Sequence, residues 1–290
     1  MDSNGTLQLP NVAKVSVYSP FRYPGGKSRW YFFIKRWVRA TSPKLFVEPF
    51  AGGAHAGLTV AIEDWPGNEV EKVVLIERDP DVAAVWKTIL GNRSEWLREK
   101  ILNFEMSLSA AEEAVSKREK SVRHRALATM IRNRAIRGGL ITPDSGWLNK
   151  GEKDKGLNSR WYPETLSERI RKINEVSNII EFIHGDAFAE WDTFLSERKA
   201  AHFIDPPYPN SGTRLYNFSD VKCERVFNTS KEIDGDYLIT YESTDRILDI
   251  CERLNMEHQK VSVKNANHDS KEELLIGKYL KWASSEPKKV

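Results

Sequence analysis

An apolar run over residues 200–204 ends on the motif Asp205-Pro206-Pro207-Tyr208. A carboxylate fixed there could accept a hydrogen bond from an amine, and the carbonyl of Pro206 could accept a second one, because Pro207 restrains the backbone that aims it. Two acceptors would pull a delocalised exocyclic amine towards a tetrahedral nitrogen, which is the nucleophile that methyl transfer requires. The ring of Tyr208 could stack on a base held outside its helix. The motif therefore predicts a site for an amine of a base, with a rigid exit turn from a strand as the plain alternative.

A glycine pair joins a second apolar run to a helical pattern. Residues 44–50 form a short strand-like run, Gly52 and Gly53 follow, and apolar residues at helical spacing continue over 54–62. Paired glycines let the backbone turn tightly and approach a ligand closely, and a helix that begins there offers free N–H groups. The full G-x-G-x-x-G spacing is missing, which disfavours a pyrophosphate-binding loop. An ordinary strand-to-helix turn is the alternative reading.

An acid closes the next predicted strand. Residues 71–80 read EKVVLIERDP, and Glu77 stands where the apolar run ends. An acid at this position of a Rossmann-like sheet commonly accepts hydrogen bonds from the hydroxyls of a ribose, whereas a single acid at a strand end is more often solvated. Together with the glycine turn, Glu77 indicates a ligand that contains a nucleoside.

The stretch from Tyr23 to Lys27 reads YPGGK and precedes both of these features. Its turn would allow a close approach of the backbone, and Lys27 would offer a point charge to a carboxylate or phosphate. Tyr23 would offer a ring for stacking. A surface turn without function explains the stretch about equally well.

Strand-like runs and helical patterns alternate along most of the chain, which predicts a doubly wound α/β fold. Residues 1–17 read as a loose leader, and residues 138–163 are rich in Gly, Asn, Asp and Ser and read as loop. Further strands are predicted at 178–186, 236–241, 258–264 and 272–280, the last two as an antiparallel hairpin. Further helices are predicted at 81–90, 164–176, 187–198 and 244–254.

The alternation breaks at residues 93–175, which are mostly helical and basic. This stretch holds 18 Lys/Arg against 12 Asp/Glu, although the whole chain of 290 residues has a net charge of only +3. Between Lys117 and Arg137 there are eight basic residues and one acid, Glu119. A basic segment on a nearly neutral protein favours a polyanionic partner, and a solvated helix face is the alternative. We predict a catalytic domain of residues 1–92 and 176–290, with residues 93–175 as the insert.

Other classes of protein are disfavoured by composition. The two cysteines, Cys223 and Cys251, are far apart and have no metal-binding spacing, which suits a reducing compartment. The N-terminus does not resemble a signal peptide, and no apolar run reaches membrane-spanning length. We expect a cytoplasmic protein without a metal or a membrane partner.

These motifs, in this order, resemble the DNA adenine-N6 methyltransferase family, in the alpha class that places its target-recognition insert between the cofactor motifs and the catalytic motif. The resemblance covers nearly the whole chain, through FRYPGGK, FVEPFAGGA, IERD, GD, DPPY and the closing KEELLI, with DPPY and PGGK the most specific pieces. It implies a Rossmann-like seven-stranded methyltransferase sheet whose last strand is inserted antiparallel. Tyr23 departs mildly from the pattern, since relatives often have Trp there, and the segment 221–235 is less familiar.

The resemblance implies S-adenosylmethionine as the cofactor and double-stranded DNA as the partner of a monomer or weak dimer. It places Glu77 on the ribose, Asp186 on the adenine of the cofactor, Asp205 between cofactor and target amine, and Tyr208 on the flipped adenine. The implied catalytic residues are Asp205, Pro206, Pro207 and Tyr208. The implied cofactor contacts are Tyr23, Lys27, Phe50, Gly52, Gly53, Glu77, Asp186 and Asp205.

With this resemblance, the basic insert is expected to bind DNA. Phosphate contacts position a protein on DNA, and base contacts from Arg and Asn specify the sequence. Phosphate contacts are also expected from Lys117, Arg118 and Lys120. The candidate DNA-binding residues are Arg123, Arg125, Arg132, Asn133, Arg134, Arg137, Arg160 and Arg214.

Two other functions stay open. One is a methyltransferase of RNA or of a protein glutamine, which uses a similar Pro-Pro-Tyr turn but usually has Asn in place of Asp205 and lacks the basic insert. The other is a catalytically weak or inactive DNA-binding member of the fold, which would be favoured if Asp205, Tyr208 or Lys27 were missing.

Overall fold

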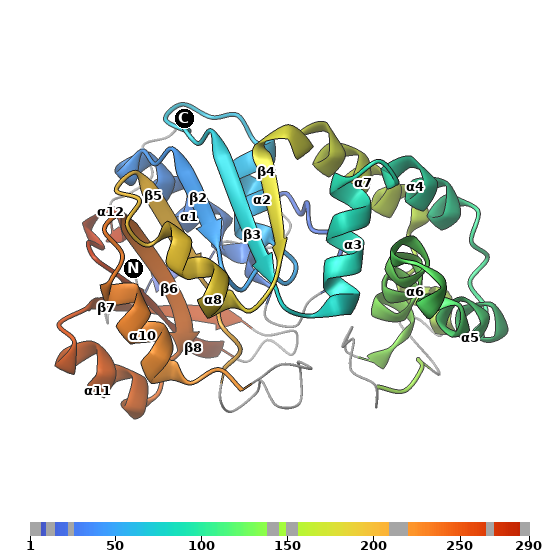
Figure 1. Ribbon diagram of the computed structural model, residues 1–290. Coiled ribbons are helices and arrows are strands. Elements are labelled where there is room, and N and C mark those ends of the chain that lie inside the picture. The colour runs from blue at the N-terminus through green and yellow to red at the C-terminus, as the bar shows by residue number, and fades with distance from the viewer. Residues whose placement is uncertain are drawn as a thin grey trace.

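The computed structural model describes residues 7–9, 15–22, 26–137, 145–148, 156–208, 220–264 and 270–284. One twisted sheet with helices on both faces occupies one side of the molecule, and a group of helices lies beyond the β4 edge of the sheet (Figure 1). The fold is α/β and Rossmann-like, as the sequence predicted.

The sheet has the strand order β1-β7-β8-β6-β5-β2-β3-β4. β8 is antiparallel to both of its neighbours, and the other pairs are parallel. Apart from the two-residue β1, this is the predicted seven-stranded sheet with its last strand inserted antiparallel. The strands are β1 Leu7–Gln8, β2 Leu45–Glu48, β3 Lys72–Glu77, β4 Ile180–His184, β5 Ala200–Ile204, β6 Asp236–Glu242, β7 Glu257–Lys264 and β8 Ser270–Gly277.

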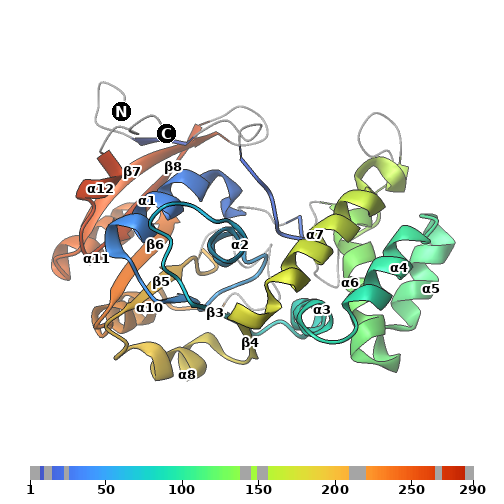
Figure 2. The same ribbon diagram turned by 90° about the horizontal axis from the view of Figure 1, so that it is seen from above.

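The central strands are apolar along their length because both faces of the sheet are covered. In β5 every residue is buried, and in β3 so are the four residues between its ends. One face packs against α1 (Tyr31–Thr41), α2 (His55–Ile62) and α12 (Lys281–Ser284), and the other against α8 (Ala187–Trp191), α10 (Cys223–Lys231) and α11 (Asp245–Arg253) (Figure 2).

The insert is helical, as predicted, and it continues the core of the sheet domain. Its helices are α4 (Ser94–Leu102), α5 (Leu108–Ser116), α6 (Val122–Ala135) and α7 (Pro163–Glu175). Helix α3 (Pro80–Leu90) lies between the sheet and α4, α5 and α6, and α7 runs beside α3 towards β4 (Figure 1). Leu97, Ile131 and Ile170 of these helices belong to the same apolar cluster as Val73 and Leu75 of β3. Burial of this shared cluster fixes the insert against the sheet domain.

Several elements differ from the sequence-based expectation. The prediction of a loose leader over 1–17 is wrong for Leu7–Gln8, which pairs with β7 and buries Leu7. Helices α1 and α10 were not predicted, and the helix expected over 187–198 ends at Trp191, with a 3-10 turn after it. The predicted loop 138–163 lies largely outside the described residues, apart from 145–148 and a 3-10 helix at Gly156–Arg160. No described helix is long and apolar enough to cross a membrane.

Candidate active site at the carboxyl edge of the sheet

Acidic residues follow the carboxyl ends of four neighbouring parallel strands. Glu48 ends β2, Glu77 ends β3, Asp186 follows β4 by two residues, and Asp205 directly follows β5. Carboxyl ends of parallel strands meet at one edge of the sheet, which is where open α/β sheets bind ligands. The fold therefore brings together four acids that lie up to 157 residues apart in the sequence.

Asp205 is held through one of its two carboxylate oxygens. Its Oδ1 accepts hydrogen bonds from the Thr240 hydroxyl (2.8 Å) and the Tyr208 hydroxyl (3.3 Å), and Lys27 Nζ lies 3.0 Å away. The side chain is 23% exposed. The structure records no contact of Oδ2 with another described residue, so this oxygen can accept a hydrogen bond from a ligand.

Lys27 is the buried cation of this site. Its side chain is 5% exposed, and its Nζ lies 3.1 Å from the Tyr208 hydroxyl and 3.6 Å from Glu273 Oε2. Burial lowers the pKa of Lys27, but the carboxylates of Asp205 and Glu273 outweigh this effect and hold that pKa well above its usual range. Lys27 is therefore a permanent positive charge beside Asp205.

Tyr208 stands between the site and the core. Its ring stacks on the ring of Tyr241 with centroids 5.2 Å apart and an interplanar angle of 21°. Burial raises the pKa of Tyr208 well above its usual range, so the hydroxyl stays a neutral donor. Pro206 is buried and Pro207 half-buried, both with trans peptide bonds. The four residues of the predicted catalytic motif thus lie together, with Tyr208 backed by a second aromatic ring.

The glycine turn after β2 is in the conformation that the sequence indicated. Gly52 has φ 47° and Ala54 has φ 50°, both in the left-handed region. The Gly52 N–H donates to Glu77 Oε2 (2.8 Å), and the Gly52 carbonyl accepts from the indole of Trp86 (3.0 Å). A Cβ on Gly53 would lie 2.9 Å from the hydroxyl of Ser19, so only glycine fits without a shift.

Glu77 joins the turn to the next helix. Its second oxygen, Oε1, accepts from the Asp79 N–H at 2.7 Å, and Asp79 in turn caps α3. Burial and the charge of Asp79 raise the pKa of Glu77 to about 7. The carboxyl group of Glu77 is thus held by backbone N–H groups at the carboxyl edge of the sheet.

Glu48 was not among the residues that the sequence singled out, although it stands in the quoted FVEPF stretch. It is 3% exposed, and its Oε2 accepts from the Gly57 N–H at 2.7 Å. Burial and the nearby charge of Asp205 raise the pKa of Glu48 to about 8. The side chain is therefore mainly protonated at neutral pH.

We expect Glu48→Gln to stabilise the protein in a pH-dependent way. A folded pKa of about 8 against 4.5 unfolded means that the native state binds the extra proton between these values, so wild type loses stability as pH rises through that window. Gln mimics the protonated acid and keeps an acceptor for Gly57. Its advantage should be near zero at pH 4.5 and about 3 kcal/mol at pH 7. Urea unfolding at several pH values tests this, and an advantage that does not change with pH would contradict it.

The other predicted cofactor residues line the same edge. Phe50 packs edge-on against Phe188 (5.7 Å between centroids), and Asp186 caps α8 by accepting from the Phe188 N–H. The Asp186 carboxylate is 43% exposed and lies 3.7 Å from Arg78. Both remain placed to contact a ring. Tyr23 and Arg214 lie outside the described residues.

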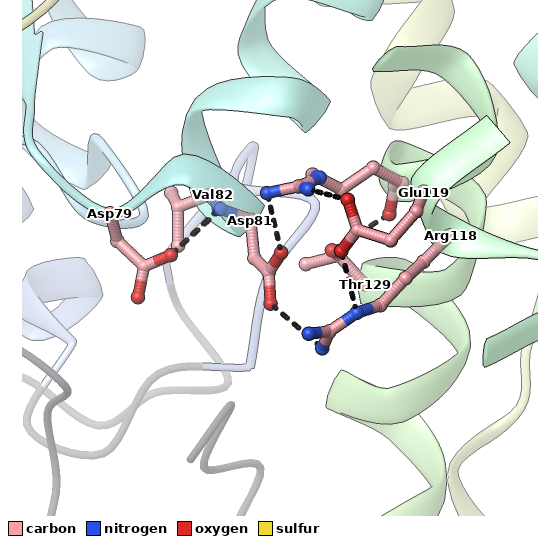
Figure 3. Close-up of polar contacts among 7 residues, drawn as sticks. Asp79, Asp81, Val82, Arg118, Glu119 and Thr129 are labelled. Carbon is pink, nitrogen blue, oxygen red and sulfur yellow. Dashed lines mark hydrogen bonds and ion pairs between the residues drawn. The ribbon is translucent and has the colours of Figure 1, made fainter. Parts of the chain in front are cut away.

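Part of the basic insert is engaged with acids of the protein itself. Arg118 and Arg125 reach Asp81 at the start of α3, at 4.0 and 3.7 Å, and both pair with Glu119 (Figure 3). Arg132 is 9% exposed. Burial lowers the pKa of Arg132, and the nearby charge of Asp81 partly offsets this effect. DNA contacts by Arg125 and Arg132 would therefore compete with Asp81.

Asn133 and Arg134 are removed from the set of DNA contacts. Asn133 is fully buried and bonded to both backbone groups of Arg22, and Arg134 is 5% exposed and donates to the Pro20 carbonyl (2.5 Å). Burial, with Arg169 and Arg22 nearby, lowers the pKa of Arg134 to about 9. Both side chains bind the chain's own backbone.

The remaining basic candidates differ in exposure. Arg123 stacks on the ring of Trp96 (4.9 Å), Arg137 is exposed, and Arg160 is half-buried. All three remain placed for contact with a polyanion.

Sequence reasoning missed three residues that hold the catalytic motif. Thr240 and Tyr241 lie on β6, next to β5, and Glu273 lies on β8 opposite Glu242. A polar Thr inside the apolar run DYLITY was the available signal for Thr240, because a buried hydroxyl needs a partner. Among the described residues, no group of three or more His, Cys, Asp or Glu could hold a metal ion.

Comparison with known proteins gives only distant likenesses. No protein-family model matches the chain, and no curated protein matches its sequence. A protein of Pyrococcus horikoshii, provisionally described as an RNA methyltransferase, aligns with 92% of this chain and 90% of its own at 9% identity and a TM-score of 0.41. The O-methyltransferase TomG of Streptomyces achromogenes, which acts in tomaymycin synthesis and was solved with SAM, aligns with 86% of this chain and 79% of its own at 9% identity and a TM-score of 0.39. At these TM-scores neither likeness is evidence for a shared activity.

Proposed function

We propose that this protein is an S-adenosylmethionine-dependent methyltransferase that methylates N6 of a flipped-out adenine at specific sites in double-stranded DNA. The observation that carries the proposal is the arrangement of Asp205 at the end of β5, with one oxygen anchored by Lys27 and Thr240 and the other without a recorded partner among the described residues. Tyr208 lies beside it, and the glycine turn with Glu77 lies on neighbouring strands.

The residues of the carboxyl edge suit the cofactor. Glu77 can accept from ribose hydroxyls, and the turn at Gly52 allows a close approach of the backbone. S-adenosylmethionine supplies an activated methyl group on a positively charged sulfur, and the carboxylate of Asp205 lies at this edge of the sheet, where it favours a cation. Lys27 supplies a complementary charge for a carboxylate of the ligand.

The chain's own groups prepare the acceptor amine. Asp205 Oδ2 would accept one amine hydrogen and the Pro206 carbonyl the other, which favours a tetrahedral nitrogen whose lone pair is no longer delocalised into the ring. Anchoring of Oδ1 by three donors fixes the direction in which Oδ2 points, and fixed acceptors need no reorganisation during the reaction. As positive charge develops on nitrogen, the carboxylate stabilises it and can take up the released proton.

Adenine in DNA fits the site better than the alternatives. Tyr208, backed by Tyr241, offers a rigid ring for a base taken out of the duplex. Arg123 and Arg137 are the basic side chains of α6 and its C-terminal end that could contact phosphates. The inactive alternative is disfavoured because Lys27, Asp205 and Tyr208 are present and in mutual contact.

The test is expression in a host that lacks DNA methylation, followed by sequencing that reads modified bases by position. The proposal expects N6-methyladenine in a defined sequence context, and purified protein should transfer labelled methyl to unmethylated duplex. Transfer to RNA or to a glutamine peptide instead of DNA, or no transfer to any of them, would reject the proposed substrate.

The exposed arginines should contribute to DNA affinity through phosphates. We expect Arg123→Ala and Arg137→Ala each to reduce the slope of log affinity against log salt by about 0.9, with similar losses on all sequences. Fluorescence anisotropy over a salt series measures the slope. Arg171→Ala is the matched control, because Arg171 pairs with Glu168 and Glu175 on α7 and should leave the slope unchanged. Equal slopes for wild type and all variants would show that Arg123 and Arg137 do not contact DNA phosphates and are only solvated.

A further inference from the structure

The insert holds the segment that leads to Lys27. Asn133 Oδ1 accepts from the Arg22 N–H and Asn133 Nδ2 donates to the Arg22 carbonyl, both at 2.8 Å. Arg134 donates to the Pro20 carbonyl at 2.5 Å, and Arg169 of α7 donates to the Ser19 carbonyl at 3.0 Å. Residues 19–22 form no helix or strand, so these side chains supply partners that secondary structure would otherwise provide.

The same segment touches the glycine turn. The Ser19 hydroxyl fills the space beside Gly53. Phe21 is 2% exposed and packs on Trp86 (5.8 Å between centroids), whose indole donates to the Gly52 carbonyl. Figure 2 shows this part of the chain passing between α2 and α7. A shift of the segment would therefore disturb the turn.

Lys27 lies five residues after Arg22 in the sequence. A chain of five residues can span at most about 18 Å. Lys27 then bonds to Asp205 and Tyr208. Among the described residues, the packed contacts that connect residues 19–22 with the carboxyl edge run through Phe21 and Trp86 to the Gly52 carbonyl.

Helix α6 carries both Asn133 and Arg134, which bind the backbone of residues 20 and 22, and the candidate DNA contacts. Arg123 and Arg125 lie in its first turns, and Asn133 and Arg134 in its last. Buried Asn133 and Arg134 are unusual in a helix interior, since burial of such groups costs free energy unless they are bonded. Their partners are backbone groups of residues 20 and 22, more than 110 residues away in the sequence.

We propose that Asn133 is a positioning residue that ties α6 to residues 19–22 and thereby couples DNA binding by the insert to cofactor binding at the glycine turn and Lys27. This inference rests on the proposed function, which supplies its two ligands, DNA and S-adenosylmethionine. Coupling of this kind is reciprocal, so DNA raises the affinity for the cofactor by the factor by which the cofactor raises the affinity for DNA.

The experiment compares wild type, Asn133→Ala and Asn103→Ala. Asn103 is the matched control, because its side-chain amide also donates to a backbone carbonyl within the insert, at Glu99, but far from residues 19–22. Binding of S-adenosylhomocysteine, which cannot transfer a methyl group, is measured by calorimetry with and without a DNA duplex. Amide hydrogen exchange at Arg22 is measured on the same proteins without ligands.

We expect DNA to tighten S-adenosylhomocysteine binding about 10-fold in wild type and in Asn103→Ala, and less than about 2-fold in Asn133→Ala. Exchange at Arg22 should accelerate at least about 10-fold in Asn133→Ala alone. Arg169→Ala removes the bond to the Ser19 carbonyl from a half-buried position and should give a partial loss of coupling even if Asn133→Ala folds poorly.

Unchanged exchange at Arg22 in Asn133→Ala would show that Asn133 does not hold residues 19–22. Intact coupling despite faster exchange would show that this hold does not couple DNA binding to cofactor binding. Absence of coupling in wild type would also reject the proposal. Failure of the proposed function looks different: wild type would then bind no S-adenosylhomocysteine or no DNA duplex, while exchange at Arg22 would still decide whether Asn133 holds the segment.

Discussion

Replacement of Asp205 by asparagine should lower the rate of methyl transfer about 10³-fold, the effect typical of removing one preorganised electrostatic group. Asparagine keeps an acceptor for the Thr240 hydroxyl, but its amide carries no charge to stabilise the developing cation on nitrogen. Single-turnover transfer of labelled methyl to unmethylated duplex measures the chemical step directly. Binding of S-adenosylmethionine should change much less than the rate, because Glu77 and the glycine turn are untouched.

The control for this substitution is Asp249→Asn. Asp249 is an exposed acid on α11, remote from the carboxyl edge, and its replacement should leave the rate within about 2-fold of wild type. A rate of Asp205→Asn within 10-fold of wild type would show that this carboxylate does not grip the acceptor amine. Equal losses of rate and cofactor affinity would instead assign Asp205 to cofactor binding.

The central strands β2, β3 and β5 were predictable because each is a short apolar run that ends on, or is followed by, an acid. β3 and β5 are buried on both faces, so the runs at 71–80 and 200–205 carry no competing helical period. The residues that follow such strands, Glu77 and Asp205, were therefore found directly. Parallel pairing then placed them on one edge without further information.

The supporting residues were not predictable because their partners are distant in sequence. Thr240 reaches Asp205 from the neighbouring strand, and Glu273 reaches Lys27 from β8. Asn133 and Arg134 read as nucleic-acid contacts because their side chains have the right chemistry, but the same donors and acceptors bond equally well to buried backbone. A local basic run cannot show which of its members face inward when the helix is buried on more than one side.

Replacement of Lys27 by methionine should destabilise the protein by about 3–5 kcal/mol at pH 8, because it leaves the carboxylates of Asp205 and Glu273 buried without their cation. Wild-type Lys27 lies 3.0 and 3.6 Å from these groups. Without the cation these two negative charges are left unneutralised, and acid conditions remove the charges. The deficit should therefore be largest at high pH and shrink as pH falls towards 4.

A double replacement identifies the cause of this loss. Adding Glu273→Gln to Lys27→Met removes one of the two unpaired charges and should restore part of the stability, whereas Glu273→Gln alone should not stabilise wild type. Lys72→Met is the matched control, since Lys72 pairs with Glu181 at the surface with both side chains more than 40% exposed. Such a pair contributes at most about 1 kcal/mol. Urea unfolding at pH 5 and pH 8 measures wild type and the four variants. A Lys27→Met deficit that equals the Lys72→Met deficit, or that deepens when Glu273→Gln is added, would show that Lys27 does not neutralise a buried pair of acids.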